Sequence, residues 1–246
     1  MTKAILFDLD DTLSVSKQQV SDAMALQFSK LLSVMPAAIV SGAMPSQIIS
    51  QFVSHLPEGS NLSNLYLFPE GAAECFSWKN GEFQLEYSHA FSSDEGQEII
   101  QALNQVLDET KMVADEPSYG ERIENRGGQI TLSTLGQQAP VEAKRVWDPN
   151  KEKRQVLRKR LLEIIPGYEI SLGGMTSVDI TKKDINKTLS VKWLAEKLQV
   201  PITDLLYVGD ALFEGGNDAV VKTTGVPTLQ TSGPEETLTI IEKYLH

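Results

Sequence analysis

Apolar residues near the start of the chain follow two alternating spacings. Residues 4–7, 37–40 and 66–68 form short continuous apolar runs, which are typical of strands buried in a parallel sheet. Between the first two runs, residues 20–32 carry apolar side chains at the spacing of one helix face, and residues 48–53 do so after the second. This alternation predicts strand–helix–strand units, in which parallel strands are joined by right-handed crossovers.

The central part of the chain has a different pattern. Two strand-like stretches at 73–77 and 82–87 flank Asn80-Gly81, a pair that favours the tight turn of a hairpin. Because the elements that follow do not alternate regularly, they indicate an antiparallel α+β unit. These elements are a helix at 95–107, strands at 122–124 and 129–135, a helix at 150–165, and strands at 168–172 and 177–180.

The final third of the chain returns to the first pattern, with a helix at 187–198, a buried strand at 205–208 and a closing helix at 235–245. We therefore predict an α/β fold, with a Rossmann-like parallel-sheet core that is interrupted by an inserted α+β cap. The predicted boundaries are 1–85 and 185–246 for the core and 86–184 for the cap, with hinges near Tyr87 and Asp184.

Composition excludes several functions. The chain has 246 residues with 41% hydrophobic content, enough for a sizeable core. Its 22 Lys and Arg against 33 Asp and Glu give a net charge of −11, so neither nucleic acid nor an anionic membrane is expected as a partner. Residues 1–10 lack the features of a signal peptide, and no apolar stretch approaches the ~20 residues of a membrane span. The single cysteine, Cys75, fits a packed hydrophobe in a reducing cytosol, so we expect a cytoplasmic protein.

Candidate chemistry lies where the predicted strands end. Asp8 and Asp10 follow the first strand, and ligands of open α/β sheets bind just outside the carboxyl ends of such strands. Alone, this acidic pair would suit the capping of the next segment better than chemistry. The polar residues expected at the same edge are Ser41, Lys187, Asp210, Asn217 and Asp218. Together they predict phosphoryl transfer, because a carboxylate attacks an anionic phosphate monoester only where a metal and fixed donors neutralise charge.

The acidic residues have distinct predicted roles. Asp8 is the candidate nucleophile, which forms an aspartyl-phosphate. Asp10 is the candidate general acid that protonates the leaving alcohol and then, as a base, activates the second acceptor. Mg²⁺ prefers oxygen ligands, so we expect it on the carboxylates of Asp8 and Asp210 and on the backbone carbonyl of Asp10.

The remaining residues would bind phosphate or orient the others. Ser41 would donate its hydroxyl to a phosphate oxygen, unless it serves as the cap of the following helix. Lys187 would supply a cation to the same group, unless it is an ordinary exposed helix lysine. Asn217 and Asp218 would orient Lys187 and the water on the metal, or else cap their own loop.

These residues stand in four motifs, which are Phe7–Leu13, Val40–Gly42, Asn186-Lys187, and Val208–Asp210 continuing to Gly215–Asp218. In order and composition, this set resembles the motifs of the haloacid dehalogenase-like (HAD) superfamily. The position and α+β character of the insert resemble its type IIB cap, which occurs in Cof-like sugar phosphatases and eukaryotic-type phosphomannomutases. The resemblance covers essentially the whole chain and implies an enzyme that transfers a phosphoryl group with Mg²⁺.

Four further segments, at 67–70, 123–128, 173–179 and 209–218, resemble the phosphomannomutases in particular. The resemblance implies that Arg126 binds the distal phosphate of a sugar bisphosphate and that Ser177 and Asp179 hold sugar hydroxyls. A plainer explanation of the latter pair is the alternation of any half-exposed strand. A homodimer through the cap is also implied by the resemblance alone.

The chain departs from the phosphomannomutase pattern in the cap. Gly136-Gln137 stands where the family has Gly-Arg, and Asp115-Glu116 falls where another arginine is expected. Losing one charged hydrogen bond, at about 1.5–3 kcal/mol, would weaken binding of a distal phosphate roughly ten- to a hundredfold. Arg122, or the basic helix at 151–160 that otherwise suits a solvated face, would have to compensate. Asp11 replaces the usual Gly of the first motif, which does not impair the nucleophile.

The sequence thus favours a HAD phosphatase that acts on a small phosphorylated sugar through Asp8. Phosphomannomutase, which interconverts mannose 6-phosphate and mannose 1-phosphate, is the alternative. A catalytically silent sensor or scaffold is a hypothesis of another class, but it would be expected to lack Asp8, Asp10, Lys187 or Asp210, and the chain has all four.

Overall fold

The structure is a computed structural model that describes residues 1–245. The chain forms two compact units, which are described separately. The core unit contains residues 1–88 and the chain from 186 onwards, and the cap unit contains residues 89–185. The sequence placed the corresponding boundaries at 85/86 and 184/185.

The core unit is built on one sheet of seven strands in the order β11-β10-β1-β2-β3-β4-β5. The strands β11, β10, β1, β2 and β3 are parallel, and β4 and β5 form an antiparallel hairpin at one edge. In this hairpin Asn80 and Gly81 have φ of 55° and 87°, as the turn requires. The parallel-sheet α/β core is therefore confirmed. Its strands are β1 Ala4–Asp8, β2 Ala37–Val40, β3 Leu65–Phe68, β4 Glu74–Lys79, β5 Glu82–Ser88, β10 Leu205–Gly209 and β11 Thr228–Gln230.

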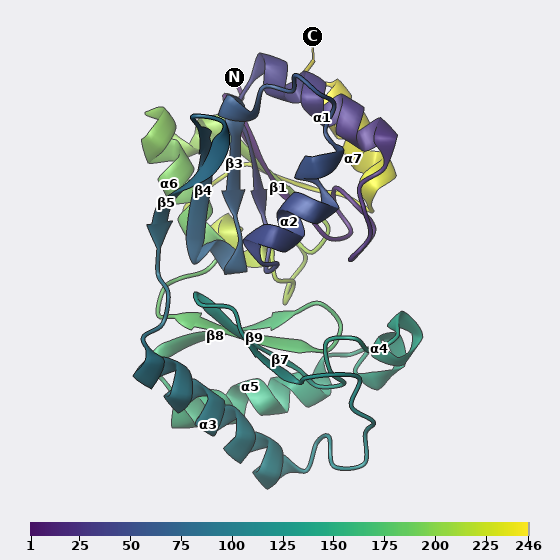
Figure 1. The fold of residues 1–246 in the computed structure, drawn as a ribbon, viewed down its shortest axis with the longest axis vertical. Helices are drawn as coiled ribbons and strands as arrows, with labels where there is room; N and C mark the ends of the chain where they lie inside the picture. Colours follow the sequence, from purple (N-terminus) through teal and green to yellow (C-terminus); the bar gives the residue numbers. More distant parts are fainter. Residues whose placement is uncertain (246) are drawn as a thin grey trace. The chain divides into compact units, whose positions relative to one another are not determined.

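Helices cover both faces of this sheet (Figure 1). Along β1, Ile5 and Phe7 join an apolar cluster with Phe28 of α1, whereas Leu6 joins a second cluster with Val191 of α6. Because both faces are buried, the strand is continuously apolar, and full burial of a side chain such as Phe28 contributes about 1.5–3 kcal/mol. The helices of the core unit are α1 Asp22–Val34, α2 Pro45–Gln51, α6 Thr188–Leu198 and α7 Pro234–Glu242, with 3₁₀ turns at Val53–His55, Leu62–Asn64, Glu70–Ala72, Ile202–Asp204 and Ala219–Thr224.

The cap unit is a four-stranded antiparallel sheet in the order β6-β7-β9-β8. Along β7, Ile130 and Leu132 join one apolar cluster with residues of α3 and α5, whereas Gln129, Thr131 and Ser133 alternate with them and lie on the opposite face. One face of the sheet is thus apolar and the other polar. The elements are α3 Ser93–Thr110, β6 Ile123–Asn125, β7 Gln129–Ser133, α4 Val141–Trp147, α5 Glu152–Ile164, β8 Tyr168–Gly173 and β9 Ser177–Lys182.

The basic helix α5 corrects one expectation. Arg154 is only 1% exposed and pairs with the buried carboxylate of Asp148 at 2.9 Å. It also donates to the carbonyls of Gly173 and Gly174, each at 2.9 Å, and so ties the β8–β9 turn to the start of α5. The prediction of a solvated basic face is wrong at this position, because a buried guanidinium needs several acceptors and here it has them.

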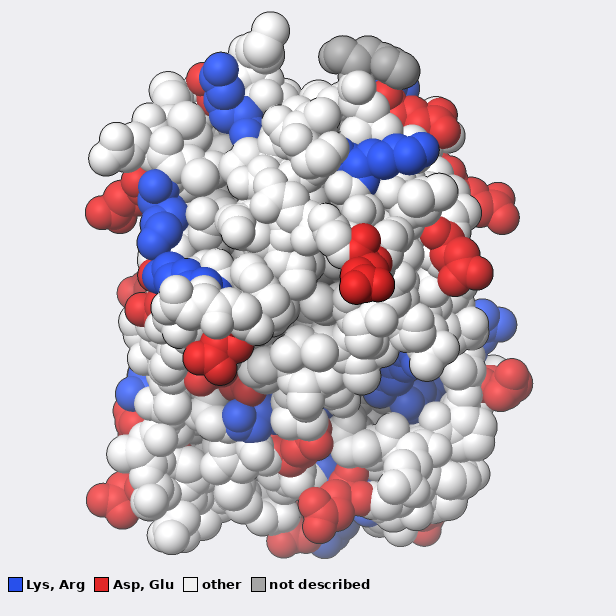
Figure 2. Space-filling view, turned by 45° about the horizontal axis from the view of Figure 1, so that its top comes forward, with Lys and Arg blue, Asp and Glu red and all other residues white. Residues whose placement is uncertain are grey.

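Other expectations from composition can be compared directly with the fold. Among residues 1–245, no helix combines the length and the apolar character needed to cross a membrane. On the face shown in Figure 2, acidic and basic side chains are interspersed. Cys75 is buried, and burial raises the pKa of its thiol, so it behaves as a packed hydrophobe. The cytoplasmic location and the homodimer stay predictions.

Candidate active site

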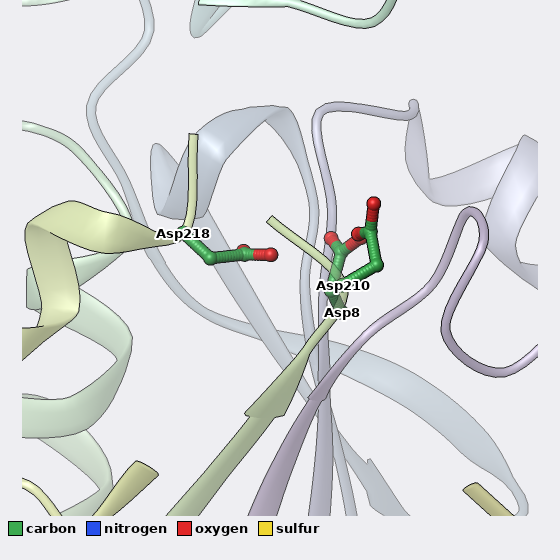
Figure 3. Close-up of side chains that lie close together, drawn as sticks. All are labelled: Asp8, Asp210 and Asp218. Carbon is green, nitrogen blue, oxygen red and sulfur yellow. The ribbon is translucent and has the colours of Figure 1, made fainter. Parts of the chain in front are cut away.

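The order of the strands gathers the candidate residues at one edge of the core sheet. The central strand β1 ends at Asp8 and is flanked by β10, which precedes Asp210, and by β2, which precedes Ser41. Figure 3 shows the carboxyl groups of Asp8, Asp210 and Asp218 close together at the strand ends, and ligand oxygens of the three lie within 4.8 Å of one another. After β1 the sheet continues to β2 on one side, and after β10 it continues to β11 on the other. Ligands of α/β sheets bind at the point where the strand order reverses in this way.

Lys187, the residue immediately before α6, extends its side chain to these acids. Its Nζ donates to Asp8 Oδ1 at 2.6 Å and to Asp218 Oδ1 at 2.7 Å. The lysine is only 6% exposed, so the alternative of an ordinary exposed helix lysine is wrong. The sequence predicted that Lys187 and Asp8 would meet, and the structure brings them into direct contact.

Burial and charge act in opposite directions on this pair. Burial raises the pKa of the Asp8 carboxyl, Lys187 lowers it, and the nearby acids Asp218 and Asp210 raise it again, so that it lies above its usual value. For Lys187, burial lowers the pKa of the ammonium, but the charges of Asp218 and Asp8 outweigh burial and raise it. The ammonium therefore stays charged and faces the candidate nucleophile.

Asp218 is held by three donors, which leaves it suited to orienting Lys187. Besides Lys187, the hydroxyl of Tyr207 donates to Asp218 Oδ1 at 2.7 Å, and the backbone N–H of Ala211 donates to Oδ2 at 3.2 Å. A Cβ on Gly209 would lie 2.5 Å from Asp218 Oδ2, so only glycine fits there. Asn217 is exposed, and of the predicted pair only Asp218 contacts Lys187.

Asp210 is the second carboxylate available to a cation. Its backbone N–H donates to the buried hydroxyl of Thr12 at 3.0 Å, which links the two loops that follow β1 and β10. Burial, together with the charges of Asp218 and Asp11 and against that of Lys187, raises the pKa of Asp210 to about 6. The carboxylates of Asp8, Asp210 and Asp218 face one ammonium, so a hard divalent cation that binds oxygen fits the donor set and the uncompensated charge.

Asp10 lies half-buried in the turn beyond β1. Its Oδ1 accepts hydrogen bonds from the backbone N–H of Lys17 at 2.7 Å and from Gln51 Nε2 at 3.3 Å. Gln51 ends α2, and its Nε2 also donates to Ser14 Oγ at 2.9 Å. The candidate general acid is thus held by two later segments of the chain, the loop at Lys17 and the end of α2.

Ser41 follows β2 and is 2% exposed. Its Oγ accepts from the backbone N–H of Ala43 at 3.1 Å, which leaves its own O–H to donate elsewhere. The residue that caps α2 is Met44, so the helix-cap alternative for Ser41 is wrong.

The sugar-binding candidates of the cap lie in and beside its sheet. Asp179 of β9 accepts a hydrogen bond from Thr131 of β7 at 2.8 Å, and Ser177 lies 3.3 Å from Ser133, oxygen to oxygen. Register pairs Thr131 with Asp179 and Ser133 with Ser177, so these side chains share the polar face of the sheet. Ordinary strand alternation accounts for that placement.

The two arginine candidates have partners within the cap. Arg126 pairs with Glu124 Oε2 at 2.6 Å. Arg122 donates to the carbonyls of Thr134 and Glu116, at 2.9 and 2.8 Å, and so joins the preceding loop to the segment after β7. These contacts give both guanidinium groups a structural role.

Gln137 has a feature that the sequence did not predict. Its Nε2 is a buried donor without a hydrogen-bond partner among residues 1–245. Lys144 of α4 donates to the backbone carbonyl of the same residue at 3.5 Å. A buried unsatisfied amide is rare in folded proteins, and this one leaves a donor available to an acceptor.

Several residues of the site carried little signal in the sequence. Tyr207 lies within an apolar strand and reads as a core residue, and Lys144 belongs to a helix that the pattern did not predict. Thr12 stands inside the first motif, so the motif itself marks it. Gln51 has no signal, because its partner Asp10 is fixed only by the fold.

The fold is that of the HAD-superfamily enzymes, and the solved structures to which the chain is similar share it. The chain matches an IMP-nucleotidase from Plasmodium falciparum with a TM-score of 0.73 and 19% identity, covering 100% of this chain and 68% of the other. It also matches BT1666, a HAD phosphatase from Bacteroides thetaiotaomicron, with a TM-score of 0.59 and 13% identity, covering 98% and 96%. At such identities the likeness shows the fold.

The chain belongs to the eukaryotic phosphomannomutase family, whose profile matches residues 24–246. It is 25% identical to a probable phosphomannomutase of Caenorhabditis elegans over 254 residues, covering 98% of this chain and 94% of the relative. It is 26% identical to phosphomannomutase 1 of Mus musculus over 223 residues, covering 87% and 80%. The matched residues begin after the first motif, Phe7–Leu13, which the structure places at the end of β1 and in the turn that follows.

Proposed function

We propose that this enzyme is a Mg²⁺-dependent phosphomannomutase that interconverts mannose 6-phosphate and mannose 1-phosphate. The sequence favoured a sugar phosphatase, but the family match supports the mutase alternative better. The observation that carries the proposal is the contact of Lys187 with Asp8 at the end of the central strand, within a family of phosphomannomutases.

The proposed reaction proceeds through Asp8. A carboxylate oxygen of Asp8 forms a bond to phosphorus as the bond between phosphorus and the sugar oxygen breaks, and Asp10 gives its proton to that oxygen. Lys187 and the hydroxyl of Ser41 balance charge on the phosphoryl oxygens. Mg²⁺, held by Asp8, Asp210 and the backbone carbonyl of Asp10, would supply further positive charge to the transferring group.

The second half of the reaction decides the product. Asp10 takes a proton from the acceptor, and the phosphoryl group leaves Asp8 for that oxygen. In a mutase the acceptor is another hydroxyl of a phosphorylated sugar, so a bisphosphate must be held by a second anion site in the cap. We assign Arg126, with Arg122 in compensation for the missing arginine, to the distal phosphate, and Ser177 and Asp179 to the sugar hydroxyls. The unsatisfied Nε2 of Gln137 is a further donor in the cap.

Sugar phosphatase activity is the second candidate, and one observation favours it. The buried donor at position 137 is a neutral amide, which binds a phosphate more weakly than a guanidinium does. A bisphosphate that is held weakly departs before it reorients, and water then completes the reaction.

One experiment separates these functions. The enzyme is incubated with mannose 1-phosphate, Mg²⁺ and a trace of hexose bisphosphate, and the products are identified. Formation of mannose 6-phosphate supports the mutase, whereas release of inorganic phosphate alone supports the phosphatase. Asp8→Asn should lose both activities while its circular dichroism spectrum stays unchanged, and a variant that kept the wild-type rate would remove the mechanism.

A further inference from the structure

The hydrogen bonds of Asp10 distinguish its two carboxyl oxygens. Oδ1 accepts from Lys17 N and from Gln51 Nε2, at 2.7 and 3.3 Å. Both partners only donate, because a backbone amide and a side-chain NH₂ offer no lone pair for a hydrogen bond. An oxygen that receives two N–H groups is the poorer place for a proton. Oδ1 is therefore occupied by these two donors, and Oδ2 is the oxygen that remains for contact with a substrate.

The two donors differ in what they contribute. The Lys17 donor belongs to the main chain, and its position depends on the loop after β1, in which Lys17 has a φ of 59°. The Gln51 donor is a side chain at the end of α2, and it is also anchored on Ser14, a residue that is 2% exposed. Gln51 thus fixes the Asp10 carboxyl from a second element of the core unit and prevents its rotation about the Lys17 contact.

We propose that Gln51 is a positioning residue, which holds the Asp10 carboxyl by Oδ1 so that Oδ2 is the oxygen that exchanges a proton with the leaving group. The inference rests on the proposed function. In the first step, the electron pair of the breaking bond between phosphorus and the sugar oxygen goes to that oxygen, which takes the Oδ2 proton, so that Asp10 becomes a carboxylate. In the second step, Oδ2 takes the proton of the acceptor hydroxyl and the cycle closes.

Two variants of Gln51 disturb the position of the Asp10 carboxyl in different ways. Gln51→Met keeps the length of the side chain and removes the donor, so the Asp10 carboxyl turns more freely. Gln51→Glu places a carboxylate opposite Asp10 Oδ1, and the repulsion between the two groups turns the Asp10 carboxyl away from this position. Gln51→Glu is therefore the more severe change.

The test compares leaving groups that need a proton with one that does not. Mannose 1-phosphate releases a sugar hydroxyl, which requires protonation, whereas 4-nitrophenyl phosphate releases a stable phenolate. General acid catalysis contributes about 10²–10⁴-fold, so Gln51→Met should slow single-turnover transfer from mannose 1-phosphate about ten- to a hundredfold. Transfer from 4-nitrophenyl phosphate should change less than about twofold, since the acid is not used. Equal losses on both substrates would overturn the proposal.

A double-mutant cycle excludes a merely structural role. In an Asp10→Ala background, adding Gln51→Met should cause no further loss on mannose 1-phosphate, because the group it positions is gone. A further loss of the same size as in the wild-type background would overturn the inference. Ser50→Ala, at the neighbouring exposed position of α2, is the matched control and should leave both rates nearly unchanged.

Failure of this inference can be told apart from failure of the proposed function. If Asp8→Asn retains transfer from both substrates, the phosphoenzyme mechanism itself is wrong. If Asp8→Asn is inactive while Gln51→Met behaves as wild type on mannose 1-phosphate, the mechanism stands and only the role of Gln51 is rejected.

Discussion

The hydroxyl of Tyr207 donates to the same carboxylate oxygen of Asp218 that receives Lys187, and each contact is 2.7 Å long. Tyr207 is fully buried in β10, two residues before the glycine that makes room for Asp218. A fixed Asp218 in turn fixes Lys187 against Asp8. The strand β10, which precedes Asp210, therefore also supports Lys187 through Asp218.

Tyr207→Phe removes one oxygen atom from this chain of contacts without changing the packing. We expect the free energy of unfolding to fall by about 1.5–3 kcal/mol, the usual contribution of a hydrogen bond to a charged group. Because Asp218 keeps Lys187 and Ala211, kcat should fall only severalfold, with KM little changed. Urea denaturation and steady-state kinetics measure the two effects, and an unchanged unfolding midpoint would show that the hydroxyl contributes nothing.

The backbone conformation at position 11 explains why glycine also suits this position. Asp11 has a φ of 58°, the left-handed region that glycine adopts most easily, and its Oδ1 accepts from the backbone N–H of Ser16 at 3.0 Å. Asp11→Ala loses the hydrogen bond and keeps the strained φ, so it should destabilise the protein by about 1–2 kcal/mol. Asp11→Gly loses the same bond but relieves the strain, and its stability should be close to that of wild type. Thermal denaturation compares the two variants, and equal losses would contradict the argument.

Proton and metal compete for Asp210. Its pKa is raised to about 6 by burial and by the neighbouring acids, so the neutral form persists to a higher pH than for an exposed aspartate. Because Mg²⁺ binds the carboxylate, its apparent affinity should be constant above about pH 7 and fall up to tenfold per unit below pH 6. The folding stability of the metal-free protein changes in the opposite direction. Because the pKa of Asp210 is higher in the folded state, this group's contribution to the free energy of unfolding is lost as the pH rises from the unfolded value of 3.8 to about 6.

Calorimetric titration with Mg²⁺ across this pH range measures the first effect. Asp11→Asn is an informative companion, because the charge of Asp11 helps to raise the pKa of Asp210. In that variant the fall in affinity should begin at a lower pH. A profile that does not depend on pH between 5 and 7 would show that Asp210 is not a ligand.

The sequence was sufficient for the elements whose burial imposes a pattern. The strands β1, β2 and β10 have both faces covered, so their runs of apolar residues identified them, and the acids at their ends could be placed at one edge. The short helix α4 was missed because it begins after Pro140 and its apolar residues Val141 and Val146 are exposed. Because Trp147 is the only buried residue of this seven-residue helix, the helix leaves little periodic signal.

Within the site, contacts made across the sheet edge were predictable and contacts made by supporting side chains were not. Lys187 and Asp8 follow from strand order. Tyr207, in contrast, could only be read as an apolar strand residue, because the position of its hydroxyl depends on how the loop at 210–218 folds back. Gln51 approaches Asp10 only through the path of α2 across the core, which no local pattern encodes.

The unsatisfied amide of Gln137 leads to the last prediction, which concerns the outcome of the reaction. Gln137→Arg replaces a neutral donor by a guanidinium that binds phosphate with two parallel hydrogen bonds. A gain of about 1.5–3 kcal/mol for a charged hydrogen bond corresponds to roughly ten- to a hundredfold tighter binding of a hexose bisphosphate. Because a retained bisphosphate can reorient, the ratio of mannose 6-phosphate to inorganic phosphate should rise.

Gln138→Arg is the matched control, since it adds the same charge at the neighbouring, exposed position. It should leave the product ratio unchanged, because its side chain lies outside the buried environment of the Gln137 amide. Product analysis with both variants, at equal hexose bisphosphate, distinguishes a specific anion site from a general effect of charge. If the two arginines raise the ratio equally, long-range attraction is sufficient. If neither does, the anion site of the cap lies elsewhere, and the neutral amide at 137 does not limit isomerisation.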